Sequence, residues 1–254
     1  MSGWLEGKVL ENRHWTETLF SLRVELGKSA PPLAFEAGQF VRIALDAEAG
    51  NPASRIARPF SFVNPPADPM LEFYGVIVPE GPLSPRLARL AAGDMLWVAD
   101  NPAGFLVLRE VPPAEDLWLV ATGTGIAPFV SILATDAPWQ RYRRVILVHA
   151  ARHARELVYR QLIEGFERRY ESKFKYVSFV SREQACGSLA GRIPAAIADG
   201  RLEAAAGPIS PERSQFMLCG NPQMLKDTSA ALAARGLKRH RRRAPGQISV
   251  EAFW

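Results

Sequence analysis

The sequence predicts two domains, an N-terminal antiparallel β-barrel followed by a C-terminal α/β domain with a doubly wound parallel sheet. Three observations lead to this prediction. The chain has 254 residues, which is long enough for two domains that each bury a core. From Lys8 to about Asn101 apolar residues mostly alternate with polar ones in short segments, as in half-buried strands. After Pro112 and Pro113 the pattern changes to a buried strand followed by a helix, and this unit repeats.

The barrel is expected to occupy residues 1–112. Its strands are predicted at residues 18–26, 39–45, 58–63, 71–78 and 95–99. Turn residues separate these strands, for example Asn64-Pro65-Pro66 and Gly93-Asp94. One helix is predicted at residues 85–91, with Ser84 as its N-cap.

The α/β domain is expected to occupy residues 113–254. Its strands are predicted at residues 117–121, 145–149, 174–180 and 216–219. The helices that follow them are predicted at residues 128–133, 155–170, 193–198 and 222–234, and residues 202–214 are predicted to be a loop. The cleft between the two domains is the expected active site.

Composition narrows the class of protein. No apolar run approaches the roughly twenty residues of a membrane helix, and the N-terminus lacks a secretory signal, so a soluble, cytoplasmic protein is expected. The spacing of Cys186 and Cys219 argues against a zinc site or a disulfide framework, and no metal is expected. Two cysteines cannot ligate a plant-type iron–sulfur cluster, so any such centre must lie on a partner protein.

The net charge of +5 suggests an acidic partner. Much of the excess lies in the basic run at residues 238–243. Nucleic acid is the usual suspect for such a run, and a solvated surface is the plainer alternative.

A glycine-rich turn follows the first strand of the second half. Gly123, Thr124 and Gly125 lie in this turn, which leads into a helix. Its backbone can approach a phosphate closely, and the free amides of the helix start suit a dinucleotide pyrophosphate. The turn lacks the third glycine of the common fingerprint, so a tight strand-to-helix connection is the alternative.

Three arginines follow the later strands. Enzymes that prefer NAD usually place a carboxylate on the ribose after the second strand, whereas this chain offers Arg152, Arg182 and Arg192. Three guanidinium groups could clamp a 2′-phosphate, which predicts a preference for NADP. Each could instead be a solvated surface residue, and Glu156 could pair with one of them.

The barrel carries a second motif, Arg58-Pro59-Phe60-Ser61-Phe62, on one predicted strand. Phe60 and Phe62 are expected on one face of this strand and Ser61 on the other. Without context the motif is typical of a core strand. However, Leu83 and Ser84 belong to another helix start that offers a second possible pyrophosphate site.

The chain resembles the bacterial ferredoxin (flavodoxin)–NADP reductases, particularly the enterobacterial type. The matching motifs cover nearly its whole length: Gly7-Lys8-Val9, Leu19-Phe20-Ser21-Leu22, Ala37-Gly38-Gln39-Phe40, Leu83-Ser84-Pro85-Arg86-Leu87, Ala121-Thr122-Gly123-Thr124-Gly125, Val148-His149-Ala150-Ala151-Arg152, Gly191-Arg192-Ile193-Pro194, Leu218-Cys219-Gly220-Asn221-Pro222-Gln223-Met224 and Val250-Glu251-Ala252-Phe253-Trp254.

The resemblance implies an FAD site and an NADP site. The residues implied for FAD are Arg58, Pro59, Phe60, Ser61, Phe62, Val76, Leu83, Ser84, Thr124, Phe253 and Trp254. Those implied for NADP are Gly123, Thr124, Gly125, Arg152, Arg182, Arg192, Cys219 and Gly220. Phe60 stands where the family usually has tyrosine, so one hydrogen bond to the flavin is missing while stacking is expected to survive.

Roles within these sites also follow from the resemblance. Arg58 is expected on the FAD phosphates, Phe253 on the far face of the isoalloxazine and Trp254 against the adenine. A seam-packing role for the last two residues is the alternative. Ser61, Cys219 and Glu251 are the implied catalytic residues near the flavin N5, although Cys219 could be an inert buried thiol.

The resemblance thus implies an FAD-dependent oxidoreductase that takes hydride from NADPH and passes single electrons to ferredoxin or flavodoxin. A monomer without nucleic-acid or membrane partners is expected. A reductase that serves an oxygenase or reduces free flavin differs only in the acceptor. A non-catalytic nucleotide-binding module is the alternative from another class.

Overall fold

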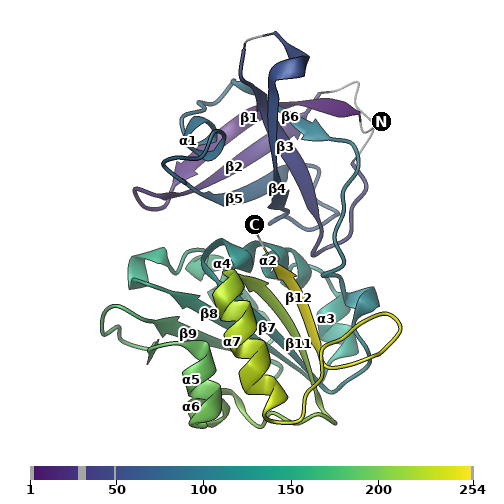
Figure 1. Cartoon of the computed structure of the whole chain (residues 1–254), viewed down its shortest axis with the longest axis vertical. Helices are drawn as coiled ribbons and strands as arrows, with labels where there is room; N and C mark the ends of the chain where they lie inside the picture. Colours follow the sequence, from purple (N-terminus) through teal and green to yellow (C-terminus); the bar gives the residue numbers. More distant parts are fainter. Residues whose placement is uncertain (1–2, 28–32, 49, 253–254) are drawn as a thin grey trace.

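The computed structural model describes residues 3–27, 33–48 and 50–252, and these form two bodies stacked along the long axis of the molecule (Figure 1). Each body is built on one six-stranded sheet. The first sheet uses residues from Trp4 to Ala99 and the second uses residues from Asp116 to Ala252. The predicted fold class, a barrel followed by a doubly wound sheet, is confirmed.

The first sheet is antiparallel throughout, in the order β4-β3-β6-β1-β2-β5. Its strands are β1 (Trp4–His14), β2 (Leu19–Leu26), β3 (Phe40–Asp46), β4 (Arg55–Ser61), β5 (Leu71–Val76) and β6 (Met95–Ala99). A bridge between Phe62 and Phe73 joins the two outer strands and closes the barrel. Strand β1 was not among the predicted strands, because only Gly7 and Val9 of its eleven residues are buried and apolar alternation is therefore weak.

The predicted helix of the barrel is shorter than expected. Helix α1 (Ser84–Leu87) has Leu83, not Ser84, at its N-cap, so the predicted cap is wrong. The Ser84 hydroxyl instead accepts a hydrogen bond of 2.9 Å from the Val78 amide and so holds the preceding loop. A short 3₁₀ turn at Pro52–Ser54 connects β3 with β4.

The second sheet is parallel throughout, in the order β10-β9-β8-β7-β11-β12. Its strands are β7 (Asp116–Thr122), β8 (Arg144–Ala151), β9 (Phe174–Val180), β10 (Leu189–Ala190), β11 (Ser214–Gly220) and β12 (Ile248–Ala252). The helices are α2 (Ala127–Leu133), α3 (Ala137–Arg141), α4 (Arg160–Arg169), α5 (Ile193–Ala198), α6 (Arg201–Ala206) and α7 (Pro222–Ala233). Further 3₁₀ turns lie at Leu108–Glu110, Gly123–Ile126 and Ala154–Glu156.

Alternate residues of the central strand β7 face opposite helix layers. Leu117 and Leu119 pack in one cluster with residues of α2, α3 and α4. Trp118 and Val120 pack in another cluster with residues of α5, α6 and α7. Since both faces are covered, β7 is a near-continuous apolar run, which is the pattern that predicted it.

Two sequence predictions for this half are corrected. The predicted helix at residues 155–170 is a 3₁₀ turn followed by α4, because Tyr159 has a φ of 61° and interrupts the helix. The predicted loop at residues 202–214 contains most of α6 and the start of β11. Helix α6 buries only Leu202 and Ala206, so its apolar periodicity is too short to recognise.

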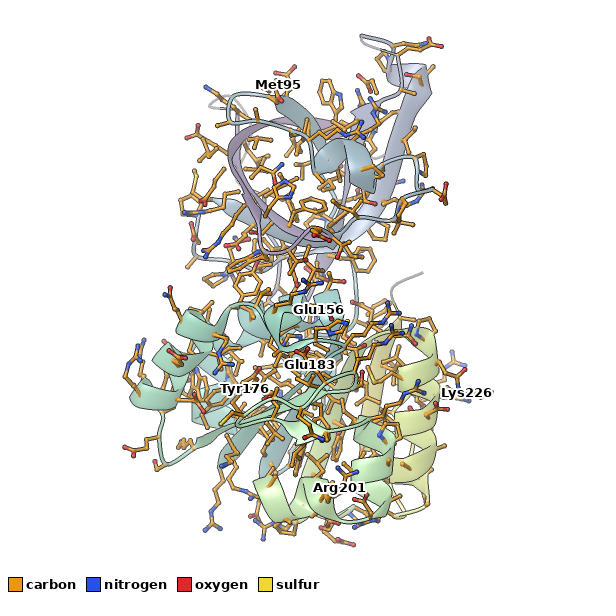
Figure 2. The ribbon with its side chains drawn as sticks, turned by 90° about the vertical axis from the view of Figure 1, so that its left-hand side faces the viewer. Met95, Glu156, Tyr176, Glu183, Arg201 and Lys226 are labelled. Atoms are coloured by element: carbon orange, nitrogen blue, oxygen red, sulfur yellow. The ribbon has the colours of Figure 1, made fainter. Side chains whose placement is uncertain are left out.

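The two halves share a packed seam. Leu19, Val63 and Tyr74 of the barrel belong to the same apolar cluster as Phe129 of α2. The Ser131 hydroxyl donates to the Asn64 carbonyl at 2.7 Å across this boundary. In Figure 2 Glu156 lies at the seam, while Met95 and Arg201 mark the far ends of the two bodies.

No helix in the described parts of the chain combines the length and apolarity needed to cross a bilayer. The described His, Cys, Asp and Glu residues contain no group of three or more arranged to hold a metal ion.

Candidate active site at the seam

A cavity of about 560 Å³ opens between strands β4 and β5 of the barrel and the start of α2. We call it the β4–β5 cavity. Its lining residues are Arg58, Pro59, Phe60, Ser61, Tyr74, Gly75, Val76, Val78, Gly81, Pro82, Leu83, Ser84, Thr124 and Ala127. Both halves of the chain therefore contribute to one mostly apolar chamber, and eight of the residues predicted for FAD line it: Arg58, Pro59, Phe60, Ser61, Val76, Leu83, Ser84 and Thr124.

Two buried hydroxyl groups of this cavity lack partners. Ser61 is 2% exposed and Tyr74 is 3% exposed, and neither side-chain oxygen has a hydrogen-bond partner among the described residues. Burial raises the pKa of Tyr74 well above its usual value, so its phenol stays protonated. Since buried polar groups are normally paired, these two fit a ligand that brings polar ring atoms into an apolar chamber, as a flavin does.

The Phe60 ring can occupy its position because the residue beside it on β5, Gly75, has no side chain. A Cβ atom at Gly75 would lie 2.9 Å from ring atoms of both Phe60 and Phe20, so a larger residue would force these rings to move. Phe60 is among the residues that line the cavity, and its stacking on the flavin stays a prediction. Phe62 differs, because its ring is fully buried in the barrel core and stacks on Phe35 with a centroid distance of 3.8 Å. Phe62 therefore packs in the barrel core and does not line the cavity.

The glycine-rich turn lies where the loops after β7 and β11 meet. Gly123 has a φ of 52°, and a Cβ at Gly125 would lie 2.4 Å from the Cys219 carbonyl oxygen. Gly220 has a φ of 132°, where a Cβ would lie 2.4 Å from the Thr122 hydroxyl oxygen. Glycine at these positions allows the two backbone segments to approach closely.

His149 supports this turn from below. Burial lowers the pKa of His149 to about 4, so the ring is neutral, and its Nε2 lies 3.2 Å from the Gly123 carbonyl oxygen. The neutral ring can donate one hydrogen bond to this carbonyl. His149 thereby holds the turn in position, a role that sequence reasoning missed.

Cys219 and Glu251 face each other on neighbouring strands, because they are direct partners in the β11–β12 register. Burial raises the pKa of Glu251 to about 7, partly offset by a hydrogen bond from the Phe105 backbone. Burial and the Glu251 charge raise the pKa of the Cys219 thiol well above its usual value. The thiol is therefore protonated, and Glu251 can exchange a proton near neutral pH.

Phe40 is a neighbour of both Ser61 and Glu251. Phe40 and Ser61 are partners in the β3–β4 register. Ring atoms of Phe40 and the Glu251 carboxylate both lie 3.1 Å from the position that a Cβ of Gly104 would occupy. Ser61 therefore lies on the strand next to Phe40, whose ring is close to the Glu251 carboxylate. The shared catalytic role of Ser61, Cys219 and Glu251 stays a prediction.

The three predicted arginines lie at the carboxyl ends of the second sheet. Arg152 and Arg182 follow β8 and β9, and the Arg182 amide donates to the Arg152 carbonyl at 3.0 Å, so these two loops lie side by side. Arg192 is the N-cap residue of α5. All three side chains are exposed, and within the described ranges none lies at ion-pair distance from a carboxylate.

Glu156 was the residue that could have paired with one of these arginines, but its carboxylate forms other hydrogen bonds. Its carboxylate accepts from the amides of Arg152 and His153, at 2.9 and 3.3 Å. The carboxylate is therefore used to fold its own loop, and the guanidinium groups stay available.

The basic run at residues 238–243 lies in the loop before β12. Its Arg242 donates two hydrogen bonds to the Glu110 carboxylate, at 3.0 and 2.8 Å, and lies over the Phe105 ring at 4.3 Å. The run therefore lies beside the segment that contacts Glu251. The predicted aromatic cover of the flavin, Phe253 and Trp254, falls outside the described residues.

Tyr74, Gly75 and Ala127 line the β4–β5 cavity but were not predicted. The sequence contained a signal for Tyr74 and for Ala127. Tyr74 lies on the same face of β5 as the predicted residue Val76. Ala127 follows the glycine-rich turn directly, which is the position where a helix start meets its ligand.

Known proteins resemble this chain along its whole length. The model of the oxidoreductase NAD-binding domain family matches residues 119–230. The flavodoxin/ferredoxin–NADP reductase of Escherichia coli (strain K12) is 48% identical over 256 residues, with 100% of both chains covered. The ferredoxin–NADP reductase of Pseudomonas aeruginosa is 37% identical, with 99% of this chain and 98% of the relative covered.

A solved structure extends the similarity to the fold. A ferredoxin NADP+ reductase from Neisseria gonorrhoeae, with bound FAD and NADP, superposes with a TM-score of 0.91 at 32% identity and covers 99% of both chains.

A barrel and a nucleotide-binding sheet that share one apolar cavity define a two-domain pyridine-nucleotide-dependent oxidoreductase. The 48% sequence identity to the Escherichia coli reductase over the full length of both chains identifies the family more specifically than the fold does. The chain belongs to the flavodoxin/ferredoxin–NADP reductase family.

Proposed function

We propose that this protein binds FAD in the β4–β5 cavity, oxidises NADPH and passes electrons one at a time to ferredoxin or flavodoxin. The observation that carries the proposal is the cavity itself, which both halves line and in which Ser61 and Tyr74 keep unpaired hydroxyl groups. FAD, when bound, supplies the ability to accept a hydride and to release two electrons singly.

The barrel residues bind and orient the flavin. Phe60 offers a ring for stacking, and Ser61 offers a hydroxyl to the flavin edge. Arg58 is exposed at the rim of the cavity and supplies the one charged side chain of its lining, which suits the FAD phosphates. Leu83 and Ser84 add the start of α1. We keep Phe253 and Trp254 as the aromatic cover of the flavin on the resemblance alone.

The second half binds and orients NADPH. Gly123, Thr124 and Gly125 with Gly220 place backbone amides beside the nicotinamide end. Arg152, Arg182 and Arg192 bind the 2′-phosphate at the other end. Cys219, as a neutral thiol, fills the space between the turn and the flavin without adding charge.

Glu251 would take up the proton that the flavin would release when it gives up its two electrons. Its pKa of about 7 allows it to give up or take a proton at neutral pH, and Ser61 provides a hydroxyl on the barrel side. The released proton would therefore have a carboxylate acceptor at the site.

Several further features belong to the same proposal. We assign residues 1–112 to the FAD-binding domain and residues 113–254 to the NADP-binding domain. We propose a cytoplasmic monomer whose basic surface, including residues 238–243, attracts an acidic electron carrier. Nucleic acid and membranes have no part in it.

An anaerobic titration of the purified protein with NADPH and then NADH tests this function through its visible absorbance. We expect a flavin spectrum that NADPH bleaches at much lower concentration than NADH. A bleached protein that then reduces neither ferredoxin nor flavodoxin would favour an oxygenase or free-flavin reductase. A colourless protein that takes up no added FAD would refute the proposal.

A further inference from the structure

A second cavity, of about 470 Å³, lies at the seam and shares no lining residue with the β4–β5 cavity. Its lining residues are Glu11, Arg13, Trp15, Ser21, Arg23, Glu72, Arg155, Leu157, Val158, Tyr159, Arg160, Gln161 and Leu162. We call it the arginine cavity. Strands β1, β2 and β5 form its barrel side, and the segment leading into α4 forms the other side.

Four arginines line this cavity, two from each half of the chain. Arg13 and Arg23 come from the barrel, and Arg155 and Arg160 come from the α/β half. All four are exposed, and among the described residues none lies within ion-pair distance of a carboxylate. Four guanidinium groups held around one concave space repel one another unless an anion lies between them.

The two carboxylates of the cavity offset only part of this charge. Glu72 is directly opposite Arg23 in the β2–β5 register, but its Oε1 accepts a hydrogen bond of 2.8 Å from the Tyr159 hydroxyl. Glu72 thus binds the two halves together at the base of the cavity. Glu11 is exposed at the β1 side and is the other acidic residue of the lining.

The start of α4 borders the same space. Tyr159 has a φ of 61° and is the N-cap residue of α4, a ten-residue helix that has no side-chain cap. Arg160, Gln161 and Leu162 are the first residues of this helix and all line the cavity, and their amides precede the first helical hydrogen bond, which Ile163 donates to Tyr159. Free amides and the positive helix end favour an anion here.

We propose that the arginine cavity binds a small polyanion with two or more phosphate groups, at a site separate from those for FAD and NADP. Arginine forks match phosphate oxygens bidentately, and a cavity of this size suits a compact molecule. Bound there, the anion contacts arginines of both halves and stabilises the seam. The inference depends on the cavity and not on the identity of the electron carrier.

Inorganic pyrophosphate is the probe. FAD-loaded protein, saturated with NADP+ to occupy Arg152, Arg182 and Arg192, is titrated calorimetrically at low ionic strength. We expect one site per chain and a rise in melting temperature with pyrophosphate. In the double variant Arg23→Gln, Arg160→Gln we expect affinity to fall by roughly tenfold or more.

The matched control is Arg89→Gln, Arg168→Gln. These exposed arginines also come one from each half, and they line neither cavity. Affinity within about twofold of the parent is expected, because the control removes the same charge elsewhere. Should the first double variant lose FAD, Arg155→Gln alone serves as the test, with several-fold weaker binding expected.

Three results would overturn the proposal. The parent protein could fail to bind pyrophosphate, or both double variants could lose affinity equally, which would indicate nonspecific charge attraction. Tricarballylate could bind as tightly as pyrophosphate, which would refute the preference for phosphate.

Discussion

The two cavities of the seam share one strand but differ in chemistry. Tyr74 of β5 lines the β4–β5 cavity and Glu72, two residues earlier on the same face, lines the arginine cavity. The first lining has one charged side chain, Arg58, whereas the second has four arginines and two glutamates. The first space must therefore hold a ligand by shape and a few polar contacts, and the second by charge.

Two partly buried carboxylates, Glu251 and Glu72, show the same contrast. Burial raises the pKa of Glu251 to about 7, and no described cation lowers it. Burial also raises the pKa of Glu72, but the Tyr159 hydroxyl and the Arg23 charge oppose that shift. A proton-exchanging group and a structural group thus differ in whether neighbours stabilise their charge.

The largest expected effect is a change in the free energy of unfolding with pH, caused by the raised pKa of Glu251. Its pKa is about 7 in the folded chain and near 4.5 when unfolded, so the folded form binds more protons between these values. Stability should fall as pH rises from 4.5 to 7, by at most about 3 kcal/mol. Urea unfolding of flavin-free protein and Glu251→Gln across this range measures the difference.

The parent and Glu251→Gln must be compared with each other, because His149 changes the free energy of unfolding with pH in the opposite direction to Glu251. Burial lowers the pKa of His149 to about 4, so its contribution to stability is lost as pH falls from about 6.5 to 4. His149 is present in both proteins and cancels. Parallel curves for the two proteins would show that Glu251 ionises normally.

The next effect concerns the phosphate-binding end of the NADP site. Arg182→Ala should weaken NADPH binding by roughly 10- to 100-fold, because charge-assisted hydrogen bonds contribute about 1.5–3 kcal/mol. NADH should bind as before. Titration of both nucleotides against the variant and against the control Arg168→Ala checks this, and equal losses for NADPH and NADH would contradict the assignment.

A smaller effect is expected at Ser61. Removing its hydroxyl in Ser61→Ala should slow flavin reduction by NADPH by roughly fivefold, since one neutral hydrogen bond contributes about 1 kcal/mol. Stopped-flow bleaching measures the rate. Ser84→Ala is a useful control because that hydroxyl already accepts from Val78; an unchanged rate in Ser61→Ala would remove Ser61 from the site.

The smallest expected effect tests whether the two cavities are independent of each other. Arg23→Gln should leave FAD content and NADPH affinity within about twofold of the parent, because Arg23 lines only the arginine cavity. Flavin absorbance and the NADPH titration measure both quantities. A large loss of either would mean that the two cavities communicate.

The fold was largely predictable because each half has a uniform pattern. The apolar run of β7 reflects burial on both faces of its sheet, and the alternation at the end of β2, from Leu22 to Glu25, reflects burial on one face, so these strand positions could be predicted. Strand β1 and helix α6 were missed because each buries only two residues. The Tyr159 interruption was missed because nothing in its neighbours demands a positive φ.

The site was predictable in part. The glycine-rich turn and the three arginines were predicted from short local motifs, whereas Phe60 and Ser61 were assigned to FAD by the family resemblance, and these roles stay predictions. Tyr74 and Gly75 were missed, and Phe62 was expected at the cavity although its ring lies in the barrel core, because the direction of a side chain at a strand end depends on how the barrel closes.

The sequence by itself determined two domains, their order, and the residue types available for two nucleotides. Only the tertiary structure decided which of these residues meet. It joined Cys219 to Glu251 through strand register, left the hydroxyls of Ser61 and Tyr74 unpaired, and gathered four arginines from both halves in one cavity. The physical reason is that patterns along a chain report burial and backbone preference, whereas contacts between distant segments depend on the packing of whole elements.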